Sequence, residues 1–141
     1  MPAKVFVDTN IWLYALVQSN DVQGDTRHQQ AREFLCQLIR PVINSQVIRE
    51  ACANLIKKAK MPEASVQRLL QGWYRDSEVL ASNVGQHLLA SSLRTNSRFS
   101  YWDSMIVAAA LDAGCTTLYS EDMQHGQRVE GQLTIVNPFK F

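Results

Sequence analysis

The feature that most constrains the fold is a short apolar run that stops at three polar residues near the N-terminus. Residues 5–7, Val-Phe-Val, predict a strand buried on both faces. Asp8-Thr9-Asn10 follows with side-chain oxygens that favour a helix N-cap, and residues 11–17 are apolar enough for a helix. Asp8 is therefore expected where a buried strand ends and a helix begins. It is either a cap or a functional group, because open α/β sheets bind ligands at the carboxyl ends of their strands.

The rest of the chain alternates helical and strand patterns. Helices are expected over residues 26–40, 45–60, 63–75, 84–94 and 100–111, where apolar residues recur at helical spacing. Short strands are expected at residues 42–43, 79–80, 116–119 and 133–136, and residues 123–131 are expected to form a loop. This alternation predicts an α/β fold, a three-layer α/β/α sandwich around a central parallel sheet of about five short strands.

Length and composition fit one domain that spans residues 1–141, because 46% of the residues are hydrophobic and supply a single core. Cys36, Cys52 and Cys115 lie far apart without metal-binding spacing, so they are expected to be buried free thiols in a reducing compartment. The N-terminus lacks a basic region followed by a long apolar run, and no stretch approaches the length of a membrane span. We therefore expect a cytoplasmic protein without a membrane partner.

Two strand ends and two helix starts carry an acidic residue, which gives four candidate site residues: Asp8, Glu50, Asp103 and Asp122. Each also has a structural explanation. Asp103 fits a capping box with Ser100, although it precedes the most apolar helix of the chain, where a carboxylate is costly without a partner. Glu50 lies away from the apolar stripe of its helix, which favours a solvated position. Asp122 competes with Glu121, and either residue could simply cap the next turn.

Together the four acids point to a metal site. Carboxylates without a basic partner nearby in sequence repel one another, and hard divalent cations such as Mg²⁺ bind oxygen-rich sites of this kind. Mg²⁺ held by a few carboxylates suits metal-assisted phosphodiester hydrolysis. Apart from these four acids the chain has 14 basic and nine acidic residues, a balance that is compatible with a polyanionic partner.

Several motifs, taken in order, resemble those of the PIN-domain ribonucleases, and the nearest match is the small bacterial type that includes the VapC toxins. They cover the length of the chain: Asp8-Thr9-Asn10 after a strand, Glu50 at the start of a helix, Tyr-Trp-Asp-Ser-Met-Ile at 101–106, Tyr-Ser-Glu-Asp-Met at 119–123 and Asn-Pro-Phe at 137–139. The resemblance implies a parallel sheet in the order 3-2-1-4-5. That order places the ends of strands one and four side by side and brings Asp8 and Asp122 together.

The resemblance also implies a Mg²⁺- or Mn²⁺-dependent endoribonuclease that hydrolyses phosphodiester bonds in single-stranded RNA with one or two ions. Its catalytic and metal-binding residues would be Asp8, Glu50, Asp103 and Asp122, supported by hydrogen bonds from Thr9, Asn10 and Ser120. Asp122 is preferred over Glu121 because Ser120-x-Asp122 matches the hydroxyl-x-acid pattern of the family.

The same resemblance implies the toxin of a toxin–antitoxin pair, with an antitoxin protein as a further partner. A homodimer is expected partly for this reason and partly because residues 48–73 carry more apolar side chains than one small core needs.

The alternative is a non-catalytic module of the same fold that binds RNA or protein, and metal-dependent cleavage separates the two. A phosphatase with an aspartate nucleophile needs Asp-x-Asp after the first strand, whereas this chain has Asp8-Thr9-Asn10. Tyr101 and Trp102 have two interpretations as well, since they either stack on an RNA base or pack in the core. Core packing is the expectation from sequence.

Overall fold

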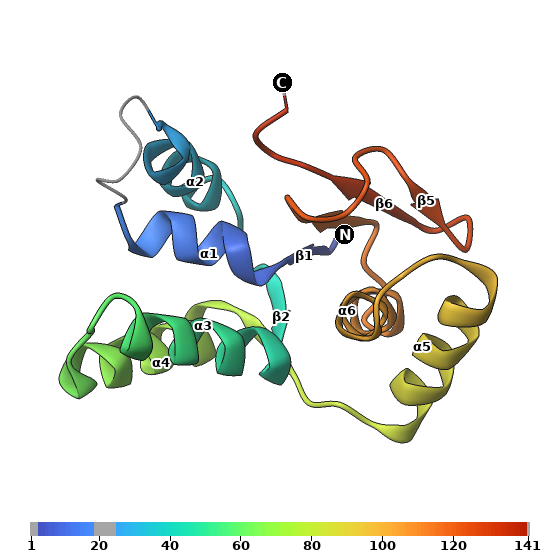
Figure 1. Ribbon diagram of the computed structural model, residues 1–141, viewed down its shortest axis with the longest axis horizontal. Coiled ribbons are helices and arrows are strands. Elements are labelled where there is room, and N and C mark those ends of the chain that lie inside the picture. The colour runs from blue at the N-terminus through green and yellow to red at the C-terminus, as the bar shows by residue number, and fades with distance from the viewer. Residues whose placement is uncertain (1–2, 19–24, 141) are drawn as a thin grey trace.

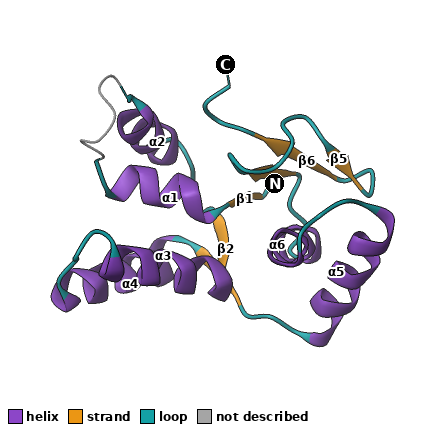
Figure 2. Ribbon diagram, in the orientation of Figure 1, coloured by secondary structure: helices purple, strands orange, loops and turns teal. Residues whose placement is uncertain are grey.

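The computed structural model describes residues 3–18 and 25–140, and it has helices on both faces of a mostly parallel sheet (Figures 1 and 2). The parallel strands are β1 (Val5–Val7), β2 (Val42–Asn44), β3 (Glu78–Leu80), β4 (Thr117–Tyr119) and β6 (Leu133–Val136). Their order is β3-β2-β1-β4-β6, which confirms the predicted order 3-2-1-4-5. β1 therefore lies inside the sheet, with Phe6 opposite Val42 on one side and Leu118 on the other.

The prediction of a loop over residues 123–131 was incomplete, because it contains the short strand β5 (Arg128–Val129). β5 pairs antiparallel with β6 and forms an edge of the sheet. Two residues bounded by turns carry no alternation pattern, so a strand of this length leaves no signal in the sequence.

Six helices among the described residues pack on the sheet or on one another: α1 (Thr9–Leu16), α2 (Arg27–Cys36), α3 (Ser45–Lys57), α4 (Glu63–Asp76), α5 (Val84–Asn96) and α6 (Tyr101–Asp112). The prediction that the second helix extends to Arg40 was wrong, because Arg40 has a positive φ of 48° that a helix does not allow. Ile39 is 93% exposed as a result, and the chain turns there to enter buried β2. None of the helices described is both long and apolar enough to span a membrane.

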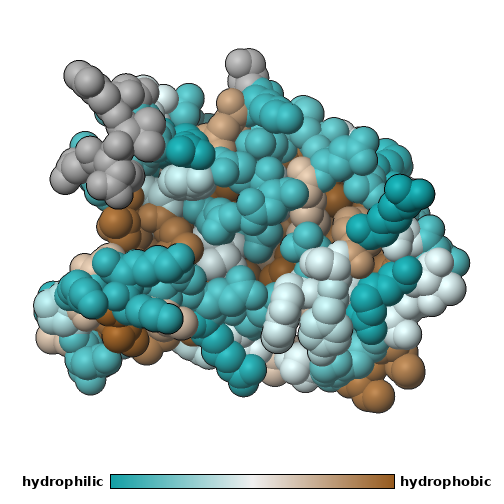
Figure 3. All heavy atoms as spheres, in the orientation of Figure 1, coloured by the Kyte–Doolittle hydropathy of each residue, from teal (hydrophilic) through white to brown (hydrophobic). Residues whose placement is uncertain are grey.

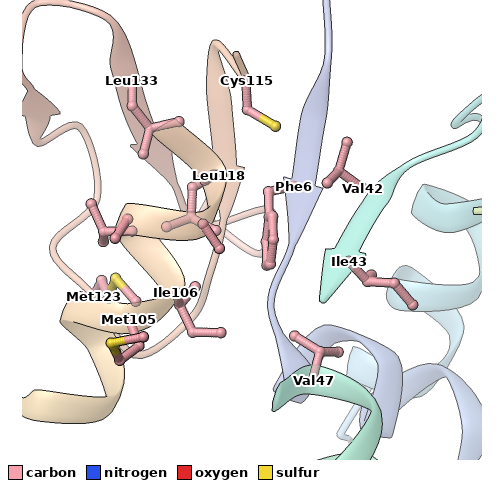
Figure 4. Packing of buried hydrophobic residues seen from close by; sticks show 14 of the residues in the cluster. Phe6, Val42, Ile43, Val47, Met105, Ile106, Cys115, Leu118, Met123 and Leu133 are labelled. Atoms are coloured by element: carbon pink, nitrogen blue, oxygen red, sulfur yellow. The ribbon is translucent and has the colours of Figure 1, made fainter. Parts of the chain in front are cut away.

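The core lies on both sides of β1, because successive strand residues point to opposite faces. Phe6 points into the larger cluster, between residues of β2 and α3 on one side and of α6 and β4 on the other (Figure 4). Val7 points to the other face, where it packs with Ile11 of α1 and Ala31 of α2. α6 is buried from Ser104 to Ala110, as its apolar sequence predicts. This packing fixes the carboxyl end of β1 in the middle of the protein.

The cysteine prediction was correct in part. The three thiols are free, and Cys115 is buried. Cys52 is only partly buried and Cys36 is exposed, because it lies in the last turn of α2, where the helix leaves the core. An apolar helical segment in the sequence therefore does not place every cysteine inside the protein.

Candidate functional site

Asp8 lies at the carboxyl end of β1 and is the N-cap of α1, which confirms its interpretation as a cap. Its backbone N–H donates to the Tyr119 carbonyl at 2.9 Å, which ties it to the end of β4. Its carboxylate accepts from the Thr9 backbone N–H at 2.8 Å and from the Ser120 hydroxyl at 2.9 Å. The residue is only 7% exposed. β1 and β4 thus hold one buried carboxylate at the point where the sheet topology predicts a ligand site.

The two residues after Asp8 each hold another predicted acid. The Thr9 hydroxyl donates to the Glu50 carboxylate at 3.0 Å, and the Asn10 amide donates to the Asp122 carboxylate. The first turn of α1 therefore connects residues that are distant in sequence. It brings three of the four candidate acids to one end of the sheet.

Glu50 reaches this turn from the second turn of α3. Asn44 caps α3 by accepting from the Val47 N–H at 3.0 Å, which fixes the start of the helix at the end of β2. Gln46, one helical turn before Glu50, donates to its other carboxylate oxygen at 2.8 Å. The expectation of a solvated position was wrong, because Glu50 is partly buried and hydrogen-bonded through both oxygens. Its offset from the apolar stripe aims it at the other acids rather than at open solvent.

Asp103 comes from the first turn of α6. The predicted cap is present, since the Ser100 hydroxyl accepts from the Asp103 backbone N–H at 3.1 Å. This cap uses the backbone of Asp103 and leaves its carboxylate available for another role. The residue is partly buried at the edge of the apolar helix. It lines a cleft of about 400 Å³ that Asp122 also lines.

The adjacent acids Glu121 and Asp122 differ in the side chains that they contact. Glu121 accepts from the Tyr14 hydroxyl at 2.8 Å and forms an ion pair with Arg27 at 3.5 Å. The Arg27 guanidinium also lies over the Tyr14 ring, 4.6 Å from its centre. These contacts hold Glu121 against α1 and α2, whereas Asp122 is exposed to the cleft that it shares with Asp103. The geometry therefore favours Asp122 as the acid of this segment.

The electrostatics of the four acids reflect their proximity. The pKa of Asp8 is raised to about 6, chiefly by burial. The charges of Glu50 and Asp103 also raise it, whereas the hydrogen bonds from Thr9 and Ser120 lower it. Burial also raises the pKa of Asp103, with a further contribution from Glu50. The pKa of Asp122 is raised by burial first and then by the charges of Glu121, Asp103 and Glu50. The charge of Glu50 therefore makes ionisation of Asp8, Asp103 and Asp122 less favourable, and the charge of Asp103 does the same for Asp8 and Asp122.

No basic side chain compensates this charge among residues 3–18 and 25–140, where none of the four acids forms an ion pair. A divalent cation would supply the missing positive charge, and the donors are the oxygens that Mg²⁺ and Mn²⁺ prefer. Within the same residues, no three Asp, Glu, His or Cys side chains stand close enough to hold one ion as they are placed. A closed cage of the zinc type does not fit. An ion such as Mg²⁺, which keeps several waters and takes one or two carboxylates, fits this open set.

The model of the PIN domain family matches residues 5–129, so the chain belongs to the PIN domain family. No curated protein sequence matches the chain.

Two solved structures with the same fold come from bacteria. The chain is similar to VapC20 of Mycobacterium tuberculosis, described as a toxin that cleaves the sarcin–ricin loop, with 19% identity and a TM-score of 0.65. That match covers 84% of this chain and 90% of VapC20. A toxin–antitoxin complex from Klebsiella pneumoniae matches with 15% identity and a TM-score of 0.73, over 99% of this chain and all of the other. At such identities the likeness establishes a shared fold.

Sequence reasoning missed two groups of residues around the site. Gln46 carried a weak signal, because it lies four residues before Glu50 and thus on the same helical face. Tyr14 and Arg27 carried none, since their contact with Glu121 depends on the tertiary fold. The expectation that Tyr101 and Trp102 pack in the core was wrong, because they are 47% and 64% exposed. They belong to the first turn of α6, which extends beyond the buried part of that helix.

Proposed function

We propose that this protein is a metal-dependent endoribonuclease that hydrolyses phosphodiester bonds in single-stranded RNA, and that it is the toxin of a toxin–antitoxin pair. One observation supports the activity most directly, namely that Thr9 and Asn10 in the first turn of α1 hold Asp8, Glu50 and Asp122 through hydrogen bonds. Membership of the PIN domain family and the fold shared with VapC20 support the same function. We further infer that a single domain, residues 1–141, carries this activity.

The chemistry follows from the donor set. A bound Mg²⁺ or Mn²⁺, as one or two ions, supplies a Lewis acid that activates water for attack on phosphorus and stabilises the leaving 3′ oxygen. Asp8 and Asp103 are proposed as direct ligands, because both are partly or fully buried and their burial strengthens the interaction with a cation. Glu50 and Asp122 either bind through water or orient the attacking water.

The supporting residues keep the acids in place. Ser120 donates to Asp8, Thr9 donates to Glu50 and Asn10 donates to Asp122, so neutral groups hold the carboxylates of three of the four acids. The bond from Ser120 favours the charged form of Asp8. None of these donors carries a positive charge that would compete with the ion. The N-terminus of α1 also points its free N–H groups toward this region, which favours an anionic substrate.

An antitoxin protein and a second copy of the chain are the proposed partners. A groove of about 370 Å³ lies between α1, α2 and α4 and is lined mainly by apolar side chains, among them Trp12, Leu16, Leu35, Leu38 and Leu69. At the left of the view, Figure 3 shows apolar side chains between α1 and α2 on one side and α3 and α4 on the other. An apolar groove of this kind fits a helix or strand of a partner protein. The toxin–antitoxin complex of the same fold supports an antitoxin as that partner.

The test is cleavage of an unstructured RNA by the purified protein in Mg²⁺, in Mn²⁺ and in chelator. We expect cleavage only with metal, and products with a 5′-phosphate, because a water activated by metal does not use the ribose 2′-hydroxyl. Asp103→Asn should abolish cleavage while it preserves the cap, which uses the Asp103 backbone. Asp76→Asn is the matched control, since Asp76 is exposed and pairs with Arg75 outside the site.

Three results would contradict the proposal in different ways. Cleavage that persists in chelator and in Asp103→Asn would identify a contaminating enzyme. Products ending in a 2′,3′-cyclic phosphate would indicate general acid–base catalysis and overturn the metal assignment. Binding of RNA or protein without turnover would support the alternative, a non-catalytic module.

A further inference from the structure

The start of α6 exposes two adjacent aromatic side chains. Trp102 is 64% exposed and Tyr101 is 47% exposed, although residues 104–110 of the same helix are buried. Trp is highly buried on average, and contiguous exposed apolar surface, such as these two adjoining rings, marks sites of interaction. Trp102 also directly precedes Asp103, one of the four proposed metal-binding acids. Its position therefore connects an exposed aromatic surface to the proposed reaction centre.

Contacts on several sides hold this aromatic pair in place. The two rings meet edge to face, with centres 5.0 Å apart and an interplanar angle of 90°. The Arg94 guanidinium lies 5.0 Å from the centre of the Tyr101 ring and donates to the Ser104 hydroxyl at 2.7 Å. Gln46 donates to the Trp102 carbonyl at 3.3 Å and to Glu50 at 2.8 Å. A ring fixed in this way loses little conformational entropy when a ligand binds.

Trp102 lines a cleft that also reaches the acids. The cleft has a volume of about 430 Å³ and is bordered by Trp102, Tyr101 and Met105 of α6 and by Arg49 and Glu50 of α3. A space of this size accommodates a small planar ligand such as a nucleobase. Because Glu50 forms part of its wall, the cleft borders the proposed site. A base held in it would lie beside one of the proposed metal-binding acids.

A second cleft adjoins the acids and is lined by Asp103, Asp122 and Arg98. Trp102 lines the first cleft and Asp103, the next residue of the first turn of α6, lines the second. Arg49 and Arg98 supply one exposed cation to each cleft, and neither forms an ion pair within the described part of the chain. Each cleft therefore combines a cation with at least one of the four acids, and the first adds an aromatic ring.

We propose that Trp102 is a stacking platform for the RNA base next to the scissile phosphate, with Arg49 facing the phosphate of that nucleotide. This inference rests on the proposed ribonuclease function and adds a residue that determines how the substrate binds. Single-stranded nucleic acids are held by aromatic rings that stack on bases together with cations that follow the backbone. The arrangement favours RNA over a protein partner, because an aromatic ring, a cation and one of the proposed metal-binding acids line the same cleft.

The first experiment compares Trp102→Ala, Trp102→Phe and Tyr74→Ala in steady-state cleavage of a short single-stranded RNA. Stacking is worth about a 5- to 150-fold change in affinity, so Trp102→Ala should raise KM by a factor in that range with kcat changed little. Trp102→Phe should restore most of the affinity. Tyr74 is an exposed aromatic residue of α4, 61% exposed and outside both clefts, and Tyr74→Ala should resemble the wild type.

The second experiment identifies the base. An abasic nucleotide is placed at each position around the cleavage site in turn, and KM is measured for the wild type and for Trp102→Ala. One abasic position should raise KM in the wild type and have no further effect in Trp102→Ala, since both changes remove the same contact. Equal effects in both proteins at every position would overturn the inference.

Further outcomes separate the inference from the proposed function. If the wild type cleaves RNA and Trp102→Ala has unchanged KM, the ribonuclease function stands and the stacking platform is wrong. If Trp102→Ala lowers kcat alone, the residue acts by positioning Asp103. If it changes the oligomeric state seen by light scattering, the ring packs in a protein interface instead. If no variant binds or cleaves RNA, the proposed function itself fails.

Discussion

Replacing Asp8 with Asn tests whether the buried charge of Asp8, close to the other acids, lowers the stability of the metal-free protein. The change keeps the size of the side chain, and the amide oxygen can still accept from the Thr9 N–H. The amide nitrogen can donate to the Ser120 hydroxyl, so the contact between Asp8 and Ser120 reverses its direction. What the substitution removes is one negative charge that is buried beside Glu50 and Asp103. We therefore expect cleavage to be lost and the metal-free protein to become more stable.

The size of this gain follows from the raised pKa. The pKa of Asp8 rises from 3.8 to about 6 on folding, so the folded state binds a proton more tightly than the unfolded state. Stability therefore falls as the pH rises from 3.8 to about 6, by about 3 kcal/mol in total, and this loss is complete at pH 8. The reversed hydrogen bond costs about 1 kcal/mol. Asp8→Asn should thus gain about 2 kcal/mol at pH 8, or roughly 4 to 8 °C in Tm.

The assay is thermal melting of the wild type, Asp8→Asn and Asp76→Asn at pH 4 and pH 8, in chelator and in Mn²⁺. The advantage of Asp8→Asn should be present at pH 8 and absent at pH 4, where Asp8 is protonated in the folded protein. Mn²⁺ at a hundredfold excess over its dissociation constant should stabilise the wild type by about 2.7 kcal/mol and Asp8→Asn far less. Asp76→Asn should keep the full metal effect, because Asp76 lies outside the site.

One combination of results would refute this reasoning. If Asp8→Asn is clearly less stable than the wild type at pH 8 in chelator and still shows the full Mn²⁺ effect, Asp8 serves only as the cap of α1. The proposed metal site would then be wrong at its central residue.

Two further predictions concern the environment of Asp8 and the assembly of the protein. The Ser120 hydroxyl donates to Asp8 and holds its pKa down, so Ser120→Ala should move that pKa above about 6 in an NMR titration of the metal-free protein. An unchanged or lower value would show that this bond does not stabilise the charged form. The chain should also form a homodimer at micromolar concentration, and light scattering that finds only a 16 kDa species would contradict this.

The sequence was informative wherever one local rule determined the outcome. The apolar run of β1 followed by Asp8, and the Ser100 cap before Asp103, each produced the structure that their pattern predicts. The order of the parallel strands followed from the family resemblance, and it explains why Asp8 contacts Ser120 while Asn10 contacts Asp122. In these cases the backbone geometry alone decides where the functional group lies.

The remaining features depend on contacts that no local pattern encodes. Glu50 appeared solvated on a helical wheel, and its role in the cluster depends on Thr9, which lies 41 residues away in sequence. The exposure of Trp102 could not be inferred from sequence. An aromatic residue in the first turn of an apolar helix gives the same sequence pattern whether its ring is buried or exposed. Glu121 and Asp122 are adjacent acids that only the positions of Tyr14 and Arg27 distinguish.

The pairing of β1 with β4 also determines when during its own synthesis the protein acquires a site. Asp8 is made 112 residues before Ser120, and Asn10 is separated from Asp122 by the same distance. At about 5 to 20 residues per second, a ribosome needs on the order of 10 s to cover that interval. Until β4 has left the ribosome, β1 lacks one of its two neighbours and the acids cannot assemble. A nascent or prematurely terminated chain that lacks β4 therefore cannot assemble the proposed site, so the topology withholds the proposed ribonuclease activity until β4 has been made.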